Sequence, residues 1–129
     1  MLLDLITLQV LYGLVQPPAR AGRVSEHLSR NWGAVGARTP EWNFDIGTFP
    51  GSLEVMAHAQ AGQCLRALQL MRLQWGYMIN FENSTRSSFW EGYHKDGSFA
   101  YQGGTKLLLL LLLLLHVRFI FQRCMQAHT

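Results

Sequence analysis

The chain has 129 residues, the length of one domain, and a formal net charge of +3. Charged residues make up 15% of the sequence, below the roughly 25% of an ordinary soluble domain, which argues against a highly charged disordered tail. The arginines at 20, 23, 30 and 38 are loosely spaced between prolines and glycines, so we expect no nucleic-acid partner.

The first 21 residues have the layout of a secretory signal peptide. An apolar stretch over 2–15 is followed by two prolines and by an A-x-A sequence that ends at Ala21, after which cleavage is expected. Asp4 opposes this interpretation, because a signal peptide begins with a basic region. The alternative is an ordinary N-terminal helix that packs against the rest of the protein.

Residues 16–51 are predicted to form a long irregular loop, and 22–51 is rich in proline, glycine and arginine. All four prolines of the chain lie in 16–51, and no apolar period of 2 or 3.6 residues continues there. A loop of this length argues against one tight fold. We therefore predict a mostly α protein that is incompletely folded.

The clearest pattern predicts one long amphipathic helix over about 52–75, inside a helical segment 52–79. Ser52 is a suitable N-cap just before the first apolar residue. Apolar residues then recur mostly three or four positions apart, which is typical of a face that packs on a core or on a partner helix. The stripe consists of Leu53, Met56, Cys64, Leu68, Met71, Trp75 and Met78.

Residues 80–106 are polar and aromatic, and a small hairpin is predicted within 89–102. Asp96-Gly97 is the preferred pair for a two-residue type I′ turn. Such a turn places Tyr93 opposite Ala100. Since an isolated hairpin is marginally stable in water, we expect a helix to cover it.

Nine consecutive leucines begin a predicted apolar helix over about 107–121, which a tail at 122–129 follows. The leucines favour membrane insertion by roughly 3–5 kcal/mol, and Arg118 opposes it by about 2.5–3.5 kcal/mol. Fifteen helical residues span only about 22 Å of the ~30 Å hydrocarbon layer. We expect a membrane span here, with the lipid bilayer as partner and the membrane as location. The alternatives are a buried core helix, an aggregation-prone segment, and a codon-repeat expansion that packing never selected.

Two weak modification motifs fit a membrane topology. Asn83 begins an N-glycosylation sequon with Ser84 and Thr85, which matters only if the N-terminus enters the secretory route. Cys124 follows the predicted span and is a candidate for palmitoylation. The two cysteines, Cys64 and Cys124, are 60 residues apart, and this spacing predicts neither a disulfide framework nor a metal site.

The motifs of common enzymes are absent from the sequence, including G-x-S-x-G, H-E-x-x-H and G-x-G-x-x-G. We expect no catalysis, no cofactor, no metal and no small-molecule substrate. The first interpretation is a small non-enzymatic single-pass membrane protein. The second is a soluble helical interaction module, with helix 52–75 and the leucine tract in a partner's groove. The third is a reading frame without a selected function, because the predicted elements do not agree on one fold.

Overall fold

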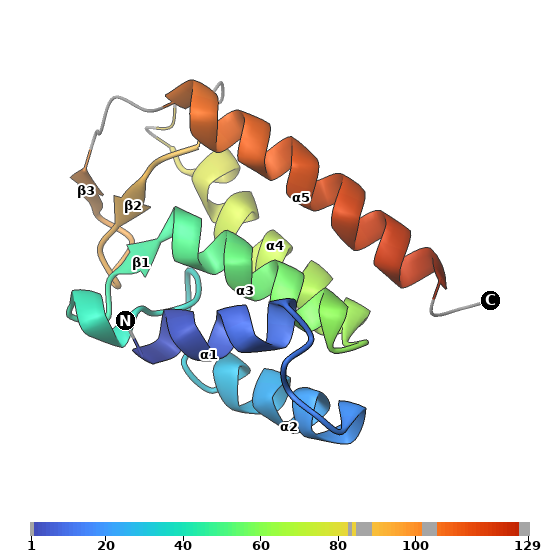
Figure 1. The fold of residues 1–129 in the computed structure, drawn as a ribbon. Helices are drawn as coiled ribbons and strands as arrows, with labels where there is room; N and C mark the ends of the chain where they lie inside the picture. Colours follow the sequence, from blue (N-terminus) through green and yellow to red (C-terminus); the bar gives the residue numbers. More distant parts are fainter. Residues whose placement is uncertain (1, 83, 85–88, 102–105, 127–129) are drawn as a thin grey trace.

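The computed structural model describes the backbone of residues 2–82, 84, 89–101 and 106–126, and the side chains of 5–82, 84, 89–100, 115 and 117–126. These residues form helices and, at one end of them, a small antiparallel sheet in the order β1-β2-β3 (Figure 1). The mostly α class is confirmed. The elements are α1 (Leu2–Leu11), α2 (Pro18–Ser29), the 3-10 turn η1 (Pro40–Trp42), β1 (Ile46–Gly47), α3 (Thr48–Gln60), α4 (Cys64–Asn80), β2 (Gly92–Tyr93), β3 (Phe99–Tyr101) and α5 (Lys106–Gln126).

Helix α3 lies at the centre of the fold, where α1, α2, α4 and α5 all contact it. Small residues on α3 make this possible. Ala57 is fully buried, and at Gly51 the side chain of Gln74 from α4 fills the space that a Cβ would need. The close approach of two backbones requires such small side chains.

Two apolar clusters hold the elements together. One lies between α3, α4 and α5, where Val55, Leu70 and Ile120 are buried together. The other lies between α4 and the sheet and is mainly aromatic, with Trp75 and Tyr93 among its buried residues. The second cluster provides the helical cover that a small hairpin needs.

The single helix predicted over 52–75 is two helices in the structure. Residues 61–63 reverse the chain between α3 and α4, and Gly62 has a φ of +75° there. Side chains other than glycine rarely adopt this left-handed conformation. The stripe of apolar residues therefore lies on two helices that face each other across the core.

Helix α3 also begins earlier than predicted. It starts at Thr48, after Gly47, so Ser52 lies inside the helix and is not its N-cap. The Ser52 hydroxyl donates a hydrogen bond of 2.8 Å to the carbonyl of Phe49. This bond to a preceding carbonyl is common for serine within a helix.

The long loop predicted over 16–51 is mostly folded. It contains α2, which has proline at its first position, and it contributes Ala37 and Ile46 to the core. The buried residues of α2 are Ser25 and Leu28, one of them polar. A buried polar network also connects this helix to the core.

The N-terminal residues form α1, and its face toward α3 includes the buried Val10 and Thr7. The cleavage position expected after Ala21 lies within α2. The observed arrangement is that of the packed N-terminal helix.

The hairpin is present, but its loop is longer than predicted. Tyr93 pairs with Phe99 instead of Ala100, and the register shifts by one residue before Gly92 pairs with Tyr101. Gly97 has a φ of +90°, and the Asp96 carboxylate accepts hydrogen bonds from the amide and the hydroxyl of Ser98. These bonds stabilise a three-residue loop with a bulge, the next commonest hairpin connection.

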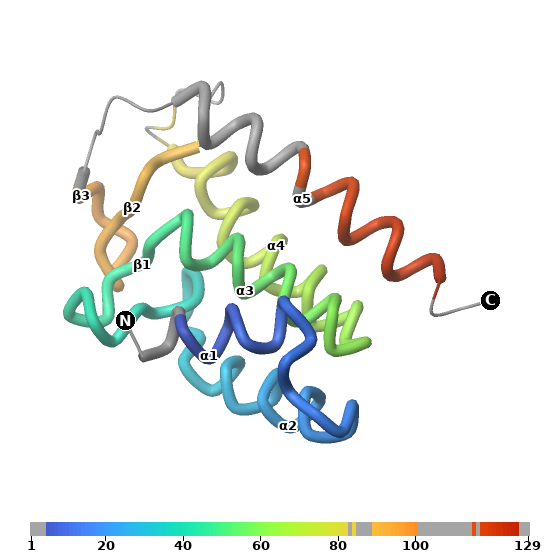
Figure 2. The backbone as a smooth tube through the Cα atoms, viewed as in Figure 1, coloured from blue at the N-terminus to red at the C-terminus, as the bar shows by residue number. Residues whose placement is uncertain are grey.

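The leucine tract lies in α5, which is longer than the predicted segment 107–121. Figure 2 shows α4 and α5 running in opposite directions, so that the C-terminal turns of α5 return to the start of α4. Within the described residues, no helix combines the length and the apolar character that crossing a bilayer requires. The membrane span predicted here is therefore without support from the structure.

Candidate functional site

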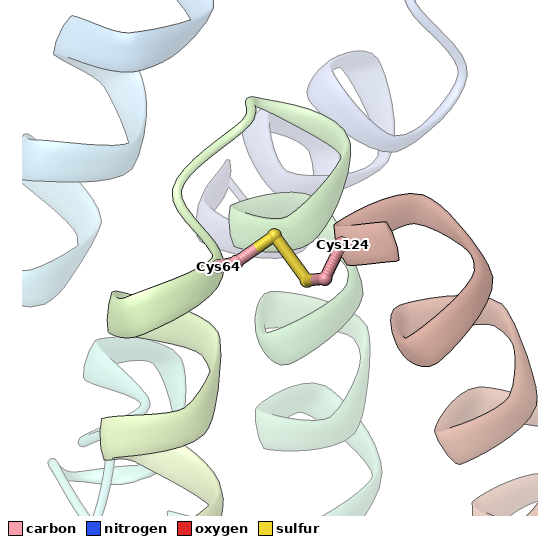
Figure 3. The surroundings of a disulfide bond; sticks show 2 residues. All are labelled: Cys64 and Cys124. Atoms are coloured by element: carbon pink, nitrogen blue, oxygen red, sulfur yellow. A yellow bond between two sulfur atoms is a disulfide. The ribbon is translucent and has the colours of Figure 1, made fainter. Parts of the chain in front are cut away.

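A disulfide joins the first residue of α4 to the last turn of α5. Cys64 and Cys124 are bonded, with their Cα atoms 5.7 Å apart (Figure 3). The sequence interpretation of these cysteines is corrected: they form a bridge, and the sulfur of Cys124 is not free for acylation in this state. The spacing of 60 residues could not reveal the bond, because it depends on the antiparallel return of α5 along α4.

Exposed apolar side chains lie within one helical turn of the disulfide, on both helices. Leu65, the neighbour of Cys64, is 78% exposed, and Phe121 on α5 is 67% exposed. Leu68 on α4 and Met125 on α5 are also exposed. We refer to Leu65, Leu68, Phe121 and Met125 as the junction face.

The two helices that form the junction face carry only positive charge. Their sequences contain four arginines and one lysine but no aspartate or glutamate. Arg72 and Arg118 are exposed, and the Arg123 guanidinium lies 5.7 Å from the centre of the Phe119 ring. An apolar surface with a basic rim favours a ligand that is apolar and acidic.

A network of hydrogen bonds between buried side chains connects α2 to α3 and α4. The Ser25 hydroxyl lies 2.7 Å from His58 Nδ1, and His58 Nε2 lies 3.2 Å from the Glu54 carboxylate. Trp32 Nε1 donates to the same carboxylate at 2.6 Å, and Arg66 Nη1 donates to the Ser25 oxygen at 2.8 Å. Every member therefore has a partner, as buried polar groups require.

The network combines the residue types of a serine hydrolase, a serine, a histidine and an acid. Ser25 and His58 are both completely buried, however, so no substrate reaches the hydroxyl. The network serves packing instead. The spacing of Glu54 and His58 by four helical positions predicts that these two are neighbours, but nothing in the sequence links them to Ser25.

The sheet end of the molecule holds a second polar cluster. Asp45 Oδ2 lies 3.0 Å from His94 Nδ1 at the surface, and the Tyr93 hydroxyl donates to the carbonyl of Val35 at 2.6 Å. Burial, together with the neighbouring Tyr77, raises the pKa of Tyr93 above its ordinary value. Tyr93 therefore stays neutral and acts as a hydrogen-bond donor at every physiological pH.

Only one of the two sequence-predicted modification sites lies among the described residues. Asn83 and Thr85 of the sequon lie outside the described residues. Cys124 lies in the disulfide at the junction face. Across the described residues, no group of three or more His, Cys, Asp or Glu side chains could hold a metal ion.

No protein-family model matches the chain, and a search of curated proteins gives no match.

Proposed function

We propose that the chain is a non-enzymatic helical interaction module and that the junction face binds an amphipathic helix with acidic flanks. The observation that carries the proposal is the group of exposed apolar side chains on two helices that contain no acidic residue. Exposed apolar side chains of this size, when grouped, mark binding surfaces more often than chance exposure does.

The disulfide supports the proposal because it fixes the relative position of the two halves of the face. With the Cα atoms of Cys64 and Cys124 held 5.7 Å apart, the start of α4 and the last turn of α5 stay next to each other. A surface that is ordered before binding loses less conformational entropy when it binds. Leu65 and Phe121 are the expected anchors, since they are the most exposed of the four.

The charge of the face favours an acidic partner over a second copy of the chain. A second copy of the chain would bring Arg72, Arg118 and Arg123 against their own equivalents, and like charges that face each other are unfavourable. A helix with a leucine face and glutamate flanks satisfies both the apolar centre and the basic rim. The second sequence interpretation places helix 52–75 and the leucine tract in a partner's groove. Because most of α3 is buried within this chain, the proposed partner helix lies against α4 and α5 instead.

Fluorescence anisotropy with a synthetic peptide tests the proposal. The probe is a labelled amphipathic peptide with leucines on one face and glutamates on its flanks, and its matched control carries lysines in place of the glutamates. We expect the oxidised protein to bind the glutamate peptide and not the lysine peptide. Leu65→Ser/Phe121→Ser should weaken binding at least about tenfold, because each apolar side chain that is buried contributes roughly 1.5–3 kcal/mol.

The control variant is Tyr12→Ser/Leu14→Ser, which removes two equally exposed apolar side chains before α2. It should bind the peptide like the unaltered protein. Equal binding of both peptides, or an equal loss in both double variants, contradicts the proposal. If Leu65→Ser/Phe121→Ser abolishes binding to vesicles but leaves peptide binding unchanged, the face binds a bilayer, and if it only abolishes self-association, the face binds a second copy.

A further inference from the structure

A groove on the opposite side of α3 from α5 lies between α1 and α2 and collects most of the positive charge of the N-terminal half. It has a volume of about 610 Å³ and is lined by Ile6, Arg20, Arg23, Val24, His27, Leu28, Arg30 and Asn31. Sites for small ligands typically have about 300–1,000 Å³. The groove is therefore large enough for a small organic ligand.

The basic side chains of the groove form one stripe along α2. Arg20, Arg23, His27 and Arg30 are spaced by three, four and three residues, which places them on one face of a helix. All four are exposed, so the guanidinium groups are accessible to a ligand. The sequence analysis predicted a loop here, in which these basic residues would not share one face. In the helix they do.

Little in the protein neutralises this stripe. In the part of the chain that the structure describes, Arg30 has an acidic partner, its Nη2 lying 3.4 Å from Glu26 Oε1, while Arg20 and Arg23 have none. The first turn of α2 contains no acidic residue. The positive end of the helix dipole and the two unpaired guanidinium groups therefore both attract an anion to the groove.

We propose that this groove binds a phosphate monoester. Guanidinium groups match phosphate oxygens geometrically, and a monoester carries about −1.5 to −2 charges at neutral pH, which balances the two unpaired arginines better than a carboxylate does. The half-buried apolar side chains of Ile6 and Val24 line the same groove and contact the organic group of the ester. The ester is either a soluble metabolite or the headgroup of a lipid such as phosphatidic acid.

Three probes test the proposal with the full-length oxidised protein: inorganic phosphate, phenyl phosphate, and phosphatidylcholine vesicles that contain phosphatidic acid. Calorimetry should show that phenyl phosphate binds more tightly than inorganic phosphate, because its ring lies against the apolar lining. Arg20→Gln/Arg23→Gln should weaken phenyl phosphate binding roughly tenfold or more, since charge-assisted hydrogen bonds are lost.

The matched control is Arg72→Gln/Arg118→Gln, which removes the same charge from α4 and α5. It should bind phenyl phosphate like the unaltered protein, and thermal unfolding should show that both double variants are folded. Binding of phenyl phosphate without vesicle binding identifies a soluble ester as the ligand, whereas loss of both in Arg20→Gln/Arg23→Gln identifies a lipid headgroup. No binding of any probe, or an equal loss in both double variants, overturns the proposal. Neither result bears on the peptide test of the junction face.

Discussion

The hydroxyl of Ser25 on α2 and the Nδ1 of His58 on α3 are 2.7 Å apart and completely buried. This bond joins α2, whose apolar face consists only of Ala21, Val24 and Leu28, to the centre of the molecule. It also connects Arg66 of α4 to Glu54 of α3 through one serine oxygen and one imidazole ring. The attachment of α2 therefore depends on polar geometry as well as on the burial of Leu28.

Replacing Ser25 by alanine should destabilise the protein by about 1–3 kcal/mol, because His58 and Arg66 are left with unsatisfied polar atoms in the interior. Urea unfolding measures this difference. Ser29→Ala is the matched control, since Ser29 lies on the same helix and its hydroxyl donates only to the carbonyl of Glu26 at the surface. A loss of equal size in both variants would show that helix propensity, and not the buried network, causes the effect.

Removing the disulfide by Cys64→Ser/Cys124→Ser should lower the free energy of unfolding by about 4 kcal/mol in the chain-entropy model, because the bond closes a loop across 60 residues. A dithiol reductant should produce the same change in the unaltered protein and no change in the variant. Hydrogen exchange should show the largest local effect at the C-terminal end of α5. Unchanged stability after reduction would mean that the packing of Ile120 alone holds this helix.

Two glycines of the α3–α4 hairpin should respond to alanine in opposite directions. Gly62→Ala should destabilise the protein by about 1–2 kcal/mol, because a Cβ is strained at a φ of +75°. Gly76→Ala should stabilise it by about 0.5–1 kcal/mol, since Gly76 lies inside α4 and alanine is the better helix former. Neither added Cβ meets an atom within 4 Å, so thermal unfolding reports the backbone effect alone. Changes of the same sign would contradict the assigned helix break.

Stability should decrease as the pH rises above 10. Burial raises the pKa of Tyr93, so the unfolded chain loses this proton at a lower pH than the folded protein does. The contribution of the neutral tyrosine is complete below pH 10 and is lost as the pH approaches the folded pKa. Urea midpoints on both sides of pH 10 measure the slope.

In Tyr93→Phe this slope should be smaller, while stability at neutral pH falls by about 1 kcal/mol because the bond to the carbonyl of Val35 is lost. Tyr12→Phe, at a side chain that is 73% exposed, should keep the slope of the unaltered protein. An unchanged slope in Tyr93→Phe would assign the alkaline transition to other groups, among them Tyr77, whose pKa burial also raises.

Local features of the fold could be predicted from the sequence, because they depend on neighbouring residues. The turn at Asp96-Gly97, the helical character of 64–80 and the helix of the leucine tract all follow from local propensity. Even there, Tyr93 pairs with Phe99 instead of Ala100, across a loop in which Asp96 is bonded to Ser98. Gly62 lies in the middle of the predicted helix, and its positive φ in the structure marks the point where the chain reverses.

Features that depend on contacts between distant residues could not be predicted. The apolar residues of α2, Ala21, Val24 and Leu28, are too few to predict the helix, and Ser25 occupies a core position only through its bonds to His58 and Arg66. The disulfide forms because α5 runs opposite to α4 and its C-terminal end lies beside the start of α4. The junction face depends on the same arrangement. The basic groove was visible in the sequence as arginines, but not as a stripe, since the helix that orders them was predicted as loop.

The bond between Cys64 and Cys124 gives the chain a closed covalent ring that includes α4, the hairpin strands and most of α5. A protease that cuts the backbone once inside this ring leaves two fragments that remain one molecule. Such a nicked protein migrates as a single species on a non-reducing gel and separates only after reduction. A cut before residue 64, in contrast, leaves two fragments that share no covalent bond, and they separate on the same gel without reduction.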